Sequence, residues 1–134
     1  MRKIRGSTQI MAGTITADRL AFSISQTSML LSTVDGVCEV HSGKHRVYNR
    51  TGRNVTISEI FLSIDTPPTG SSLTIDINQN GTSIGTTTSI LDGQYTGSSS
   101  VSVVWVNGNY LTVDTDLVGS TVAGSDLVVH IVYQ

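Results

Sequence analysis

Residues 72–90 read SLTIDINQNGTSIGTTTSI, and this stretch decides the class of fold. Apolar and polar side chains alternate from Leu73 to Asn78, which is the two-residue period of a strand with one buried face. Asn80-Gly81 follows, and both residues tolerate the positive φ of a two-residue hairpin turn. The pattern therefore predicts a β-hairpin whose exposed tip is Asn80 and Gly81.

The segment DINQNG (76–81) also has the look of a calcium loop, because oxygen-bearing side chains occupy alternate positions. A helix–loop–helix calcium site needs a glutamate eleven residues after Asp76, and that position holds Thr87. It also needs amphipathic helices on both flanks, whereas these flanks have the period of strands. We therefore interpret the polar side chains as the solvated face of the hairpin and expect no metal there.

The rest of the chain carries strand and turn signals of the same kind. Ser, Thr, Gly, Val and Ile dominate, and no window spaces its apolar residues at helical intervals over three turns. Asp35-Gly36 predicts a turn, and Asn107-Gly108 predicts a second exposed hairpin tip. Turns at intervals of about 8–12 residues indicate an all-β fold of roughly eight strands, a β-sandwich or a barrel. We expect a β-sandwich with jelly-roll-like topology, although the strand order does not follow from the sequence. Besides the hairpin, strand-like runs span 21–25, 29–34, 37–42, 45–50, 54–64, the two halves of 100–116, and 126–133.

Two of these runs carry finer expectations. In 54–64 the apolar face switches near Glu59, so we expect a β-bulge there. The run 126–133 is apolar on both faces, and His130 lies among the apolar residues of one of them. Such a strand belongs in the middle of a sheet or beneath a partner chain.

Residues 1–20 differ from the rest because they lack sustained alternation. We interpret them as an extended N-terminal arm, followed by a β-sandwich domain at 21–134. An arm alone cannot bury its apolar side chains, so we expect it to dock on its own oligomer or on another protein. The residues assigned to this docking arm are Ile4, Gln9, Ile10, Gly13, Thr14, Ile15 and Thr16.

The composition of the chain argues against several classes of function. The 134 residues suffice for one domain with a real core. A net charge of -2, with 13% charged residues, provides no basic field for nucleic acid. No apolar run is long enough to cross a bilayer, and no apolar segment of a signal peptide follows Met1. The single cysteine, Cys38, allows no intramolecular disulfide.

The sharpest cluster of reactive residue types is Cys38, His41 and His45, whose spacing is compatible with zinc ligation. A fourth ligand is absent, and Cys38 and His41 point to opposite faces if both lie in one strand. We therefore favour a buried thiol and two turn histidines, and expect no metal. The alternative is a three-fold axis that brings three copies of one histidine to a single ion.

Catalytic motifs are also absent. There is no G-x-S-x-G motif and no phosphate-binding glycine loop, and we interpret His130 as a sheet residue. Asp114 and Asp116 share a strand face and are compatible with an acidic pair, but nothing specifies a general acid. We expect neither an enzyme nor a cofactor. The aromatic residues that an exposed sugar platform would need are assigned to the core or to interfaces: Tyr48, Tyr95, Trp105, Tyr110 and Tyr133.

Several stretches carry a family resemblance. GSTQIMAGTITADRL (6–20) resembles the Q-I-x-x-G-T-I-T arm near the start of many tailed-bacteriophage tail-fibre and tail-tip proteins. Three further stretches are similar to a recurrent β-sandwich module of phage virion proteins: RVYNRTGRNVTISEI (46–60), TPPTGSSLTIDINQNGTSI (66–84) and GNYLTVDTDLVGSTVAGSDLVVHIVY (108–133).

The resemblance implies a structural protein of the virion, made in the cytoplasm of the bacterial host and assembled as a homotrimer. Tail fibres usually carry a shaft between arm and tip, and this chain has none, which implies a short tail fibre or tail-tip protein. In that reading residues 1–20 plug into the tail or baseplate, and the tips at Asn80-Gly81 and Asn107-Gly108 face a glycan or protein of the host surface. The alternative is a capsid decoration (cement) protein, whose arm and one edge clamp the major capsid protein and stabilise the head.

Overall fold

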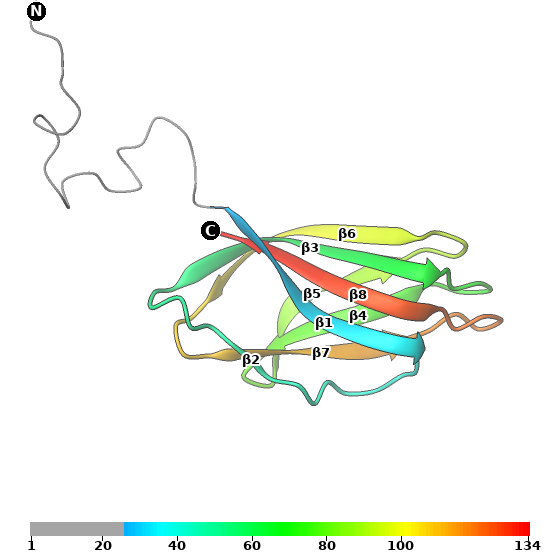
Figure 1. The fold of residues 1–134 in the computed structure, drawn as a ribbon, viewed down its shortest axis with the longest axis horizontal. Helices are drawn as coiled ribbons and strands as arrows, with labels where there is room; N and C mark the ends of the chain where they lie inside the picture. The colour runs from blue at the N-terminus through cyan, green and yellow to red at the C-terminus, as the bar shows by residue number, and fades with distance from the viewer. Residues whose placement is uncertain (1–25) are drawn as a thin grey trace, which may run out of the picture.

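The computed structural model describes residues 26–134, and these form eight strands and no helix. The strands are β1 (Thr27–Val37), β2 (Val47–Tyr48), β3 (Val55–Thr66), β4 (Leu73–Gln79), β5 (Thr82–Ile90), β6 (Thr96–Trp105), β7 (Tyr110–Leu117) and β8 (Ser125–Tyr133). They make two sheets packed face to face (Figure 1). The expected all-β sandwich is confirmed, and the proposed arm at residues 1–20 and the strand at 21–25 lie outside the described residues.

The strand orders follow a simple rule. Sheet A has the order β1-β8-β3-β6 and sheet B the order β2-β7-β4-β5, and the paired strands are antiparallel. First pairs with last, second with seventh, third with sixth and fourth with fifth. β8 lies between β1 and β3, so the prediction that the two-faced strand sits in the middle of a sheet is confirmed.

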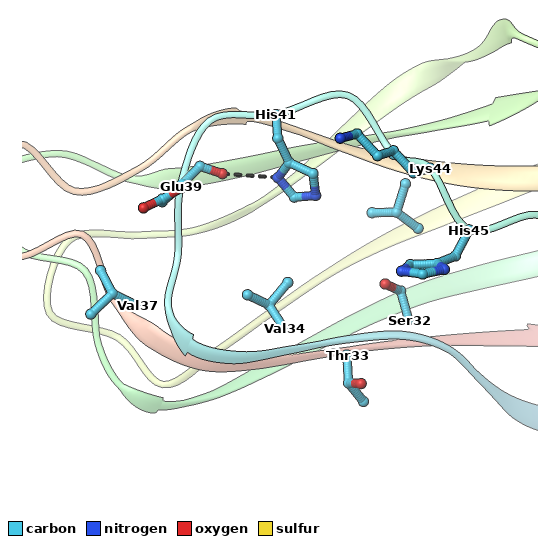
Figure 2. A pocket seen from close by; sticks show the side chains of 10 residues that line it. Ser32, Thr33, Val34, Val37, Glu39, His41, Lys44 and His45 are labelled. Atoms are coloured by element: carbon cyan, nitrogen blue, oxygen red, sulfur yellow. Dashed lines mark hydrogen bonds between the residues drawn. The ribbon is translucent and has the colours of Figure 1, made fainter.

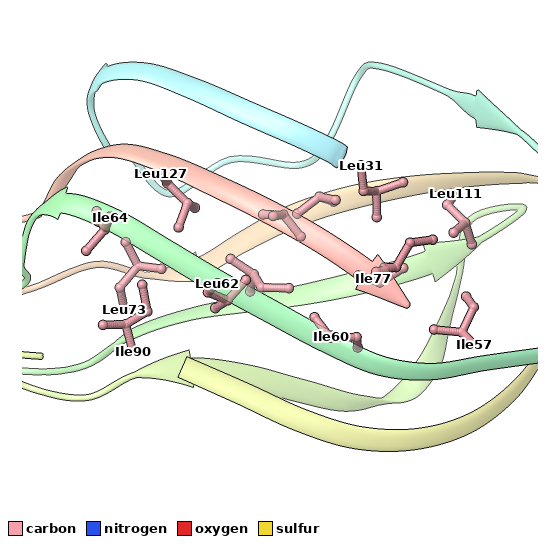
Figure 3. Packing of buried hydrophobic residues seen from close by; sticks show 14 of the residues in the cluster. Leu31, Ile57, Ile60, Leu62, Ile64, Leu73, Ile77, Ile90, Leu111 and Leu127 are labelled. Carbon is pink, nitrogen blue, oxygen red and sulfur yellow. The ribbon is translucent and has the colours of Figure 1, made fainter. Parts of the chain in front are cut away.

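The core lies between the two sheets, because alternate residues of each long strand point inward. Figure 3 shows aliphatic side chains of β3 and β8 meeting those of β4, β5 and β7. The fully buried members with the largest side chains are Trp105, Ile57, Ile60, Leu62, Leu73, Ile75, Ile77, Ile90, Leu111, Leu127, Ile131 and Val55.

The hairpin of residues 72–90 forms as predicted. β4 and β5 pair antiparallel, and Asn80 and Gly81 have φ of 51° and 84°, as a two-residue hairpin turn requires. The expected bulge at Glu59 is also confirmed, since the register of β3 shifts between Ile57 and Glu59 against both neighbouring strands.

The second predicted hairpin is wrong. Asn107-Gly108 joins β6 to β7, and these strands belong to different sheets. The local turn signal is genuine, since Gly108 has a positive φ and the Asn109 N–H bonds to the Val106 carbonyl at 3.0 Å. A turn that reverses the chain does not specify whether the next strand pairs with the previous one or crosses to the opposite sheet.

Residues 35–50 also differ from expectation. Asp35-Gly36 does not end a strand, because β1 continues to Val37 through a register shift in which Gly36 adopts φ of 83°. The expected strands at 37–42 and 45–50 shrink to an isolated bridge between His41 and Thr115 and to the short β2. The residues between these two contacts form a bulged edge segment along β7. No helix within 26–134 has the length and apolar character needed to span a membrane.

Candidate functional site

The two ends of the sandwich differ. The chain enters at Thr27, which pairs with Tyr133, and we call this the Thr27 end. Three connections between strands lie at this end: 49–54, 80–81 and 106–109. It therefore holds both tips that the sequence singled out (Figure 1). The opposite end, called the far end, is built by the connections 67–72, 91–95 and 118–124.

The structure brings the two predicted tips together. The Asn80 side-chain oxygen accepts the Tyr110 N–H at 3.1 Å, and the Gln79 side-chain oxygen accepts the Val106 N–H at 2.9 Å. Asn80, Gly81, Asn107 and Gly108 are all exposed. They therefore form one polar surface beside the point where the chain enters, rather than a surface remote from it.

Beneath this surface Asn49 is buried, with 1% of its surface exposed. Its amide nitrogen donates to the carbonyls of Trp105 and Arg53, and its oxygen accepts from the N–H and hydroxyl of Thr51. The bond to Trp105 joins the 49–54 connection to the end of β6, and the other three close this connection on itself. The structural role of Asn49 was not predicted from the sequence, because the bond to β6 joins positions that are 56 residues apart.

The far end is partly apolar, and its connections are joined by backbone hydrogen bonds. The Thr69 N–H bonds to the Val122 carbonyl at 2.9 Å, and the Gly93 N–H bonds to the Pro68 carbonyl at 2.8 Å, so the three connections support one another. Large apolar side chains remain exposed on or beside them: Leu91, Tyr95, Leu117 and Val122. Exposed apolar side chains on well-held loops are typical of a contact surface.

A second apolar surface lies on the outer face of sheet A. Leu30 of β1 sits opposite His130 of β8, which in turn sits opposite Phe61 of β3. The rings of Phe61 and His130 have centroids 6.1 Å apart, and Leu30 is 52% exposed. Val128 and Val132 flank His130 on the same face of β8. This is the second face of the strand that the sequence showed to be apolar on both sides.

One cavity opens between the two sheets, on the side where β1 faces the segment 38–46. Its volume is about 290 Å³. Figure 2 shows Val34 on one side of it and His41, Lys44 and His45 on the other. The His41 Nδ1 lies 3.0 Å from the Glu39 carbonyl oxygen, which can only accept, so Nδ1 carries the hydrogen.

Cys38, His41 and His45, whose spacing is compatible with zinc ligation, are not brought together. Cys38 is buried with 2% exposed, whereas His41 and His45 are exposed. Burial raises the pKa of the Cys38 thiol, a backbone hydrogen bond from Leu127 lowers it, and the charge of Asp126 raises it. No group of three or more His, Cys, Asp or Glu side chains within residues 26–134 is arranged to hold a metal ion.

The acidic residues of sheet B serve local structure. Asp114 accepts the Gly43 N–H at 2.7 Å and an amide hydrogen of Asn78 at 3.0 Å. Asp76 sits opposite Asp114 in the sheet. The pKa of Asp116 is raised, first by partial desolvation and then by the charges of Asp76 and Asp114. The suggested pair of Asp114 and Asp116 is thus part of a row of three, in which Asp114 has structural partners.

The aromatic side chains do not form one platform. Trp105 is buried, donates its indole N–H to the Asn109 carbonyl at 3.1 Å and packs edge-on against Tyr133. Tyr48 and Tyr110 make a separate pair with ring centroids 5.5 Å apart. The Arg46 guanidinium lies 4.5 Å from the Tyr110 ring centroid and covers its face.

Comparison with known proteins identifies no family for this chain. No protein-family model matches the chain, and a search of curated proteins gives no significant match.

Proposed function

We propose that this chain is a structural component of a tailed-phage virion: a short, trimeric tail-fibre or tail-tip protein. Residues 1–20 anchor it, and the sandwich is exposed for adhesion to the host surface. The resemblance of residues 6–20 to tail-fibre arms and of the remaining stretches to virion β-sandwich modules supports this proposal.

The proposal includes a finer description of the fold, the jelly roll. The nested pairs β1 with β8, β2 with β7, β3 with β6 and β4 with β5 are those of one long antiparallel ribbon rolled into two sheets. Eight-stranded jelly rolls are a recurrent architecture of viral capsid and lectin domains. The strand order thus supports a virion role, although a shared fold alone does not specify a function.

The observation that carries the adhesion proposal is the far end of the sandwich. It lies opposite the point at which the anchoring segment joins the domain, and it exposes Leu91, Tyr95, Leu117 and Val122 on mutually bonded connections. A surface that meets a host should be stiff, so that little conformational entropy is lost on binding. We therefore assign host contact to the far end in place of the tips at Asn80-Gly81 and Asn107-Gly108.

The outer face of sheet A supplies a surface for trimerisation, through Leu30, Phe61 and His130. We expect the full chain to have the mass of a trimer by light scattering. Leu30→Glu should give monomers with an unchanged circular dichroism spectrum, because a charge at this exposed position costs nothing until a partner covers it. Thr82→Glu, at an exposed position of β5 in sheet B, is the matched control. A monomeric wild type, or a trimeric Leu30→Glu, would exclude this interface.

A capsid decoration protein is the alternative, and one observation favours it. The predicted tips lie at the Thr27 end, so they would face whatever the arm binds. A cement protein that clamps capsid subunits with its arm and one end would have this arrangement.

Immunogold labelling of intact phage particles, with an antibody raised against residues 21–134, tests the proposal. Gold confined to the tail tip supports adhesion, and substitution of Leu91 and Leu117 by Ser should then reduce adsorption to host cells. Gold spread over the head contradicts the fibre proposal and supports the cement alternative. The absence of gold from every particle would overturn the virion assignment itself.

A further inference from the structure

The cavity beside β1 has no part in the surfaces proposed for adhesion or trimerisation. It lies on the side of the sandwich where the edge strand β1 is separated from sheet B by segment 38–46. Ser32 and Val34 reach it from β1 (Figure 2), and Val113 of β7 also lines it. The cavity is therefore a gap between the two sheets and not a dent in one loop.

A bulge in the edge segment directs polar side chains to this gap. His41 bridges to Thr115, and Val47 pairs with Leu111, so the five residues 42–46 lie opposite the three residues 112–114. Two extra residues cannot stay in the ladder, and a bulge re-aims the side chains around it. Lys44 and His45 sit in this bulge and line the cavity.

The bulge is held in place by specific contacts. The Asp114 carboxylate accepts the Gly43 N–H at 2.7 Å, and His41 exchanges two backbone hydrogen bonds with Thr115 at 3.0 and 2.9 Å. A Cβ at position 43 would overlap the main chain of Val113, so only glycine allows this close approach. The side chains that line the cavity therefore project from a preformed backbone, which lowers the cost of binding.

The lining combines cationic and hydrogen-bonding groups with an apolar wall. Lys44 supplies a positive charge. The bond to the Glu39 carbonyl uses Nδ1 of His41 and leaves Nε2 of that ring available to a ligand. His45 supplies a second imidazole. Val34 and Val113 supply apolar contact, and Ser32 supplies a hydroxyl group, whereas the Thr33 side chain points away from the cavity. The Glu39 carboxylate points away from His41 in Figure 2.

We propose that this cavity binds a small organic carboxylate with a single ring, such as a sugar acid or an aromatic acid. The carboxylate would contact Lys44 and the imidazoles, and the ring would lie on Val34 and Val113. The volume of about 290 Å³ is at the lower limit of small-molecule sites, which usually measure about 300–1,000 Å³, and it fits one ring. With one exposed lysine as its main charge, the site should bind with a Kd of about 1 mM.

The test is a titration of the isotope-labelled full chain, followed by amide chemical shifts in NMR spectra at constant ionic strength. Sodium glucuronate and sodium benzoate are the probes for the two kinds of ring acid, and glucose and benzyl alcohol are their neutral counterparts. We expect saturable shifts at Ser32, Val34, His41, Lys44 and His45 with at least one of the acids, and much weaker effects of its neutral counterpart. The acid that binds more tightly identifies the kind of ring.

Variants separate a built site from general ion binding. The double variant Lys44→Ala/His45→Gln should weaken the binding at least about fivefold, which is about 1 kcal/mol. Arg53→Ala removes an exposed charge from another connection and should leave it unchanged. The proposal is overturned if neither acid gives saturable shifts at these residues, if the neutral compounds bind equally well, or if the two variants behave alike. None of these outcomes bears on the virion assignment, which the gold labelling decides separately.

Discussion

The two long sides of the sandwich are closed in different ways. On one side β5 and β6 approach so closely that a Cβ on Gly97 would overlap the main chain of Ser89. On the other side β1 and β7 are separated by segment 38–46 and by the cavity. The first side is sealed by backbone contact and has Ile90 fully buried beside it, whereas the second is bridged by a bulge.

The difference suggests a division of roles, in which the β5–β6 side contributes stability and the β1–β7 side provides the proposed ligand site. Close packing leaves no gap between the two sheets at β5 and β6, where the hollow of about 640 Å³ lies on the outside, beside Thr87, Ser89 and Ser98. The gap between the sheets on the β1–β7 side gives up packing. We therefore expect the β5–β6 side to dominate the free energy of unfolding, and the β1–β7 side to tolerate change. Four experiments test this contrast.

The largest effect is expected from removing core atoms on the closed side. Ile90→Ala should lower the free energy of unfolding by about 2–5 kcal/mol, because it leaves a cavity in a fully packed region. Val34→Ala, on the half-buried wall of the open side, should cost about 1 kcal/mol. Urea denaturation measures both. Equal losses would mean that the two sides are equally packed.

The same substitution can be made in the close-approach glycine of each side. Gly97→Ala should cost about 1–3 kcal/mol or more, since the added methyl must separate two strands in different sheets. Gly43→Ala meets an equally close backbone but lies in an edge bulge that can move away from Val113. Its cost in urea denaturation should be smaller, and its effect on carboxylate binding larger. The reverse order would contradict the assignment of the bulge to recognition.

The reactivity of the Cys38 thiol measures how well segment 38–46 covers the core on the open side. Burial raises the pKa of its thiol, so less thiolate is present at a given pH, and the sulfur is also covered. Reaction with a thiol reagent at pH 8 should be at least about tenfold slower in the folded chain than in urea, which corresponds to about 1.4 kcal/mol of opening free energy. Labelling at the rate of the unfolded chain would show that the cavity side opens freely.

The smallest effect concerns Asp116, an exposed residue of β7, which is the sheet B strand on the open side. Its pKa is raised by desolvation and by Asp76 and Asp114, so the folded state binds this proton more tightly than the unfolded state. The resulting stability is present below its ordinary pKa of 3.8 and is lost as pH rises through the folded value. At pH 7, Asp116→Asn should therefore have a slightly higher thermal midpoint than wild type. At pH 3 this difference should be smaller, because Asp116 of the folded wild type is then largely protonated. Added salt should shrink that gain, and a gain that is the same at both pH values would contradict the charge repulsion.

The sequence could predict what is encoded by neighbouring residues. Alternation in residues 72–90 and the backbone needs of Asn80-Gly81 determine a hairpin by themselves, and the switch of face at Glu59 reveals a bulge within one strand. Partners distant in sequence were not predictable. Asn107-Gly108 turns the chain, but packing of the whole core determines that β7 joins the other sheet. The edge segment at 37–50 has strand-like composition, yet its bulge depends on a bond to Asp114.

The candidate surfaces show the same limit. The apolar outer side of β8 was readable from the alternation in 126–133, and its neighbours Leu30 and Phe61 were not, because strand order brings them there. His41 and His45 were noticed for metal chemistry, but the cavity that they share with Lys44 needs β1 as its opposite wall. The far end carries no motif, since its apolar residues come from separate connections.

The position of β8 has a consequence for how the chain is made. β8 is the last of the eight strands to leave the ribosome, and it lies between β1 and β3. Until it emerges, β1 has no partner in its sheet and one edge of β3 stays unpaired. Sheet A therefore cannot be completed before β8 has emerged, and its pairing with β1 joins strands far apart in sequence, which is slow in topologies of this kind. During that wait the nascent domain is exposed to aggregation, so its yield in the cell should depend on chaperones more than its final stability suggests.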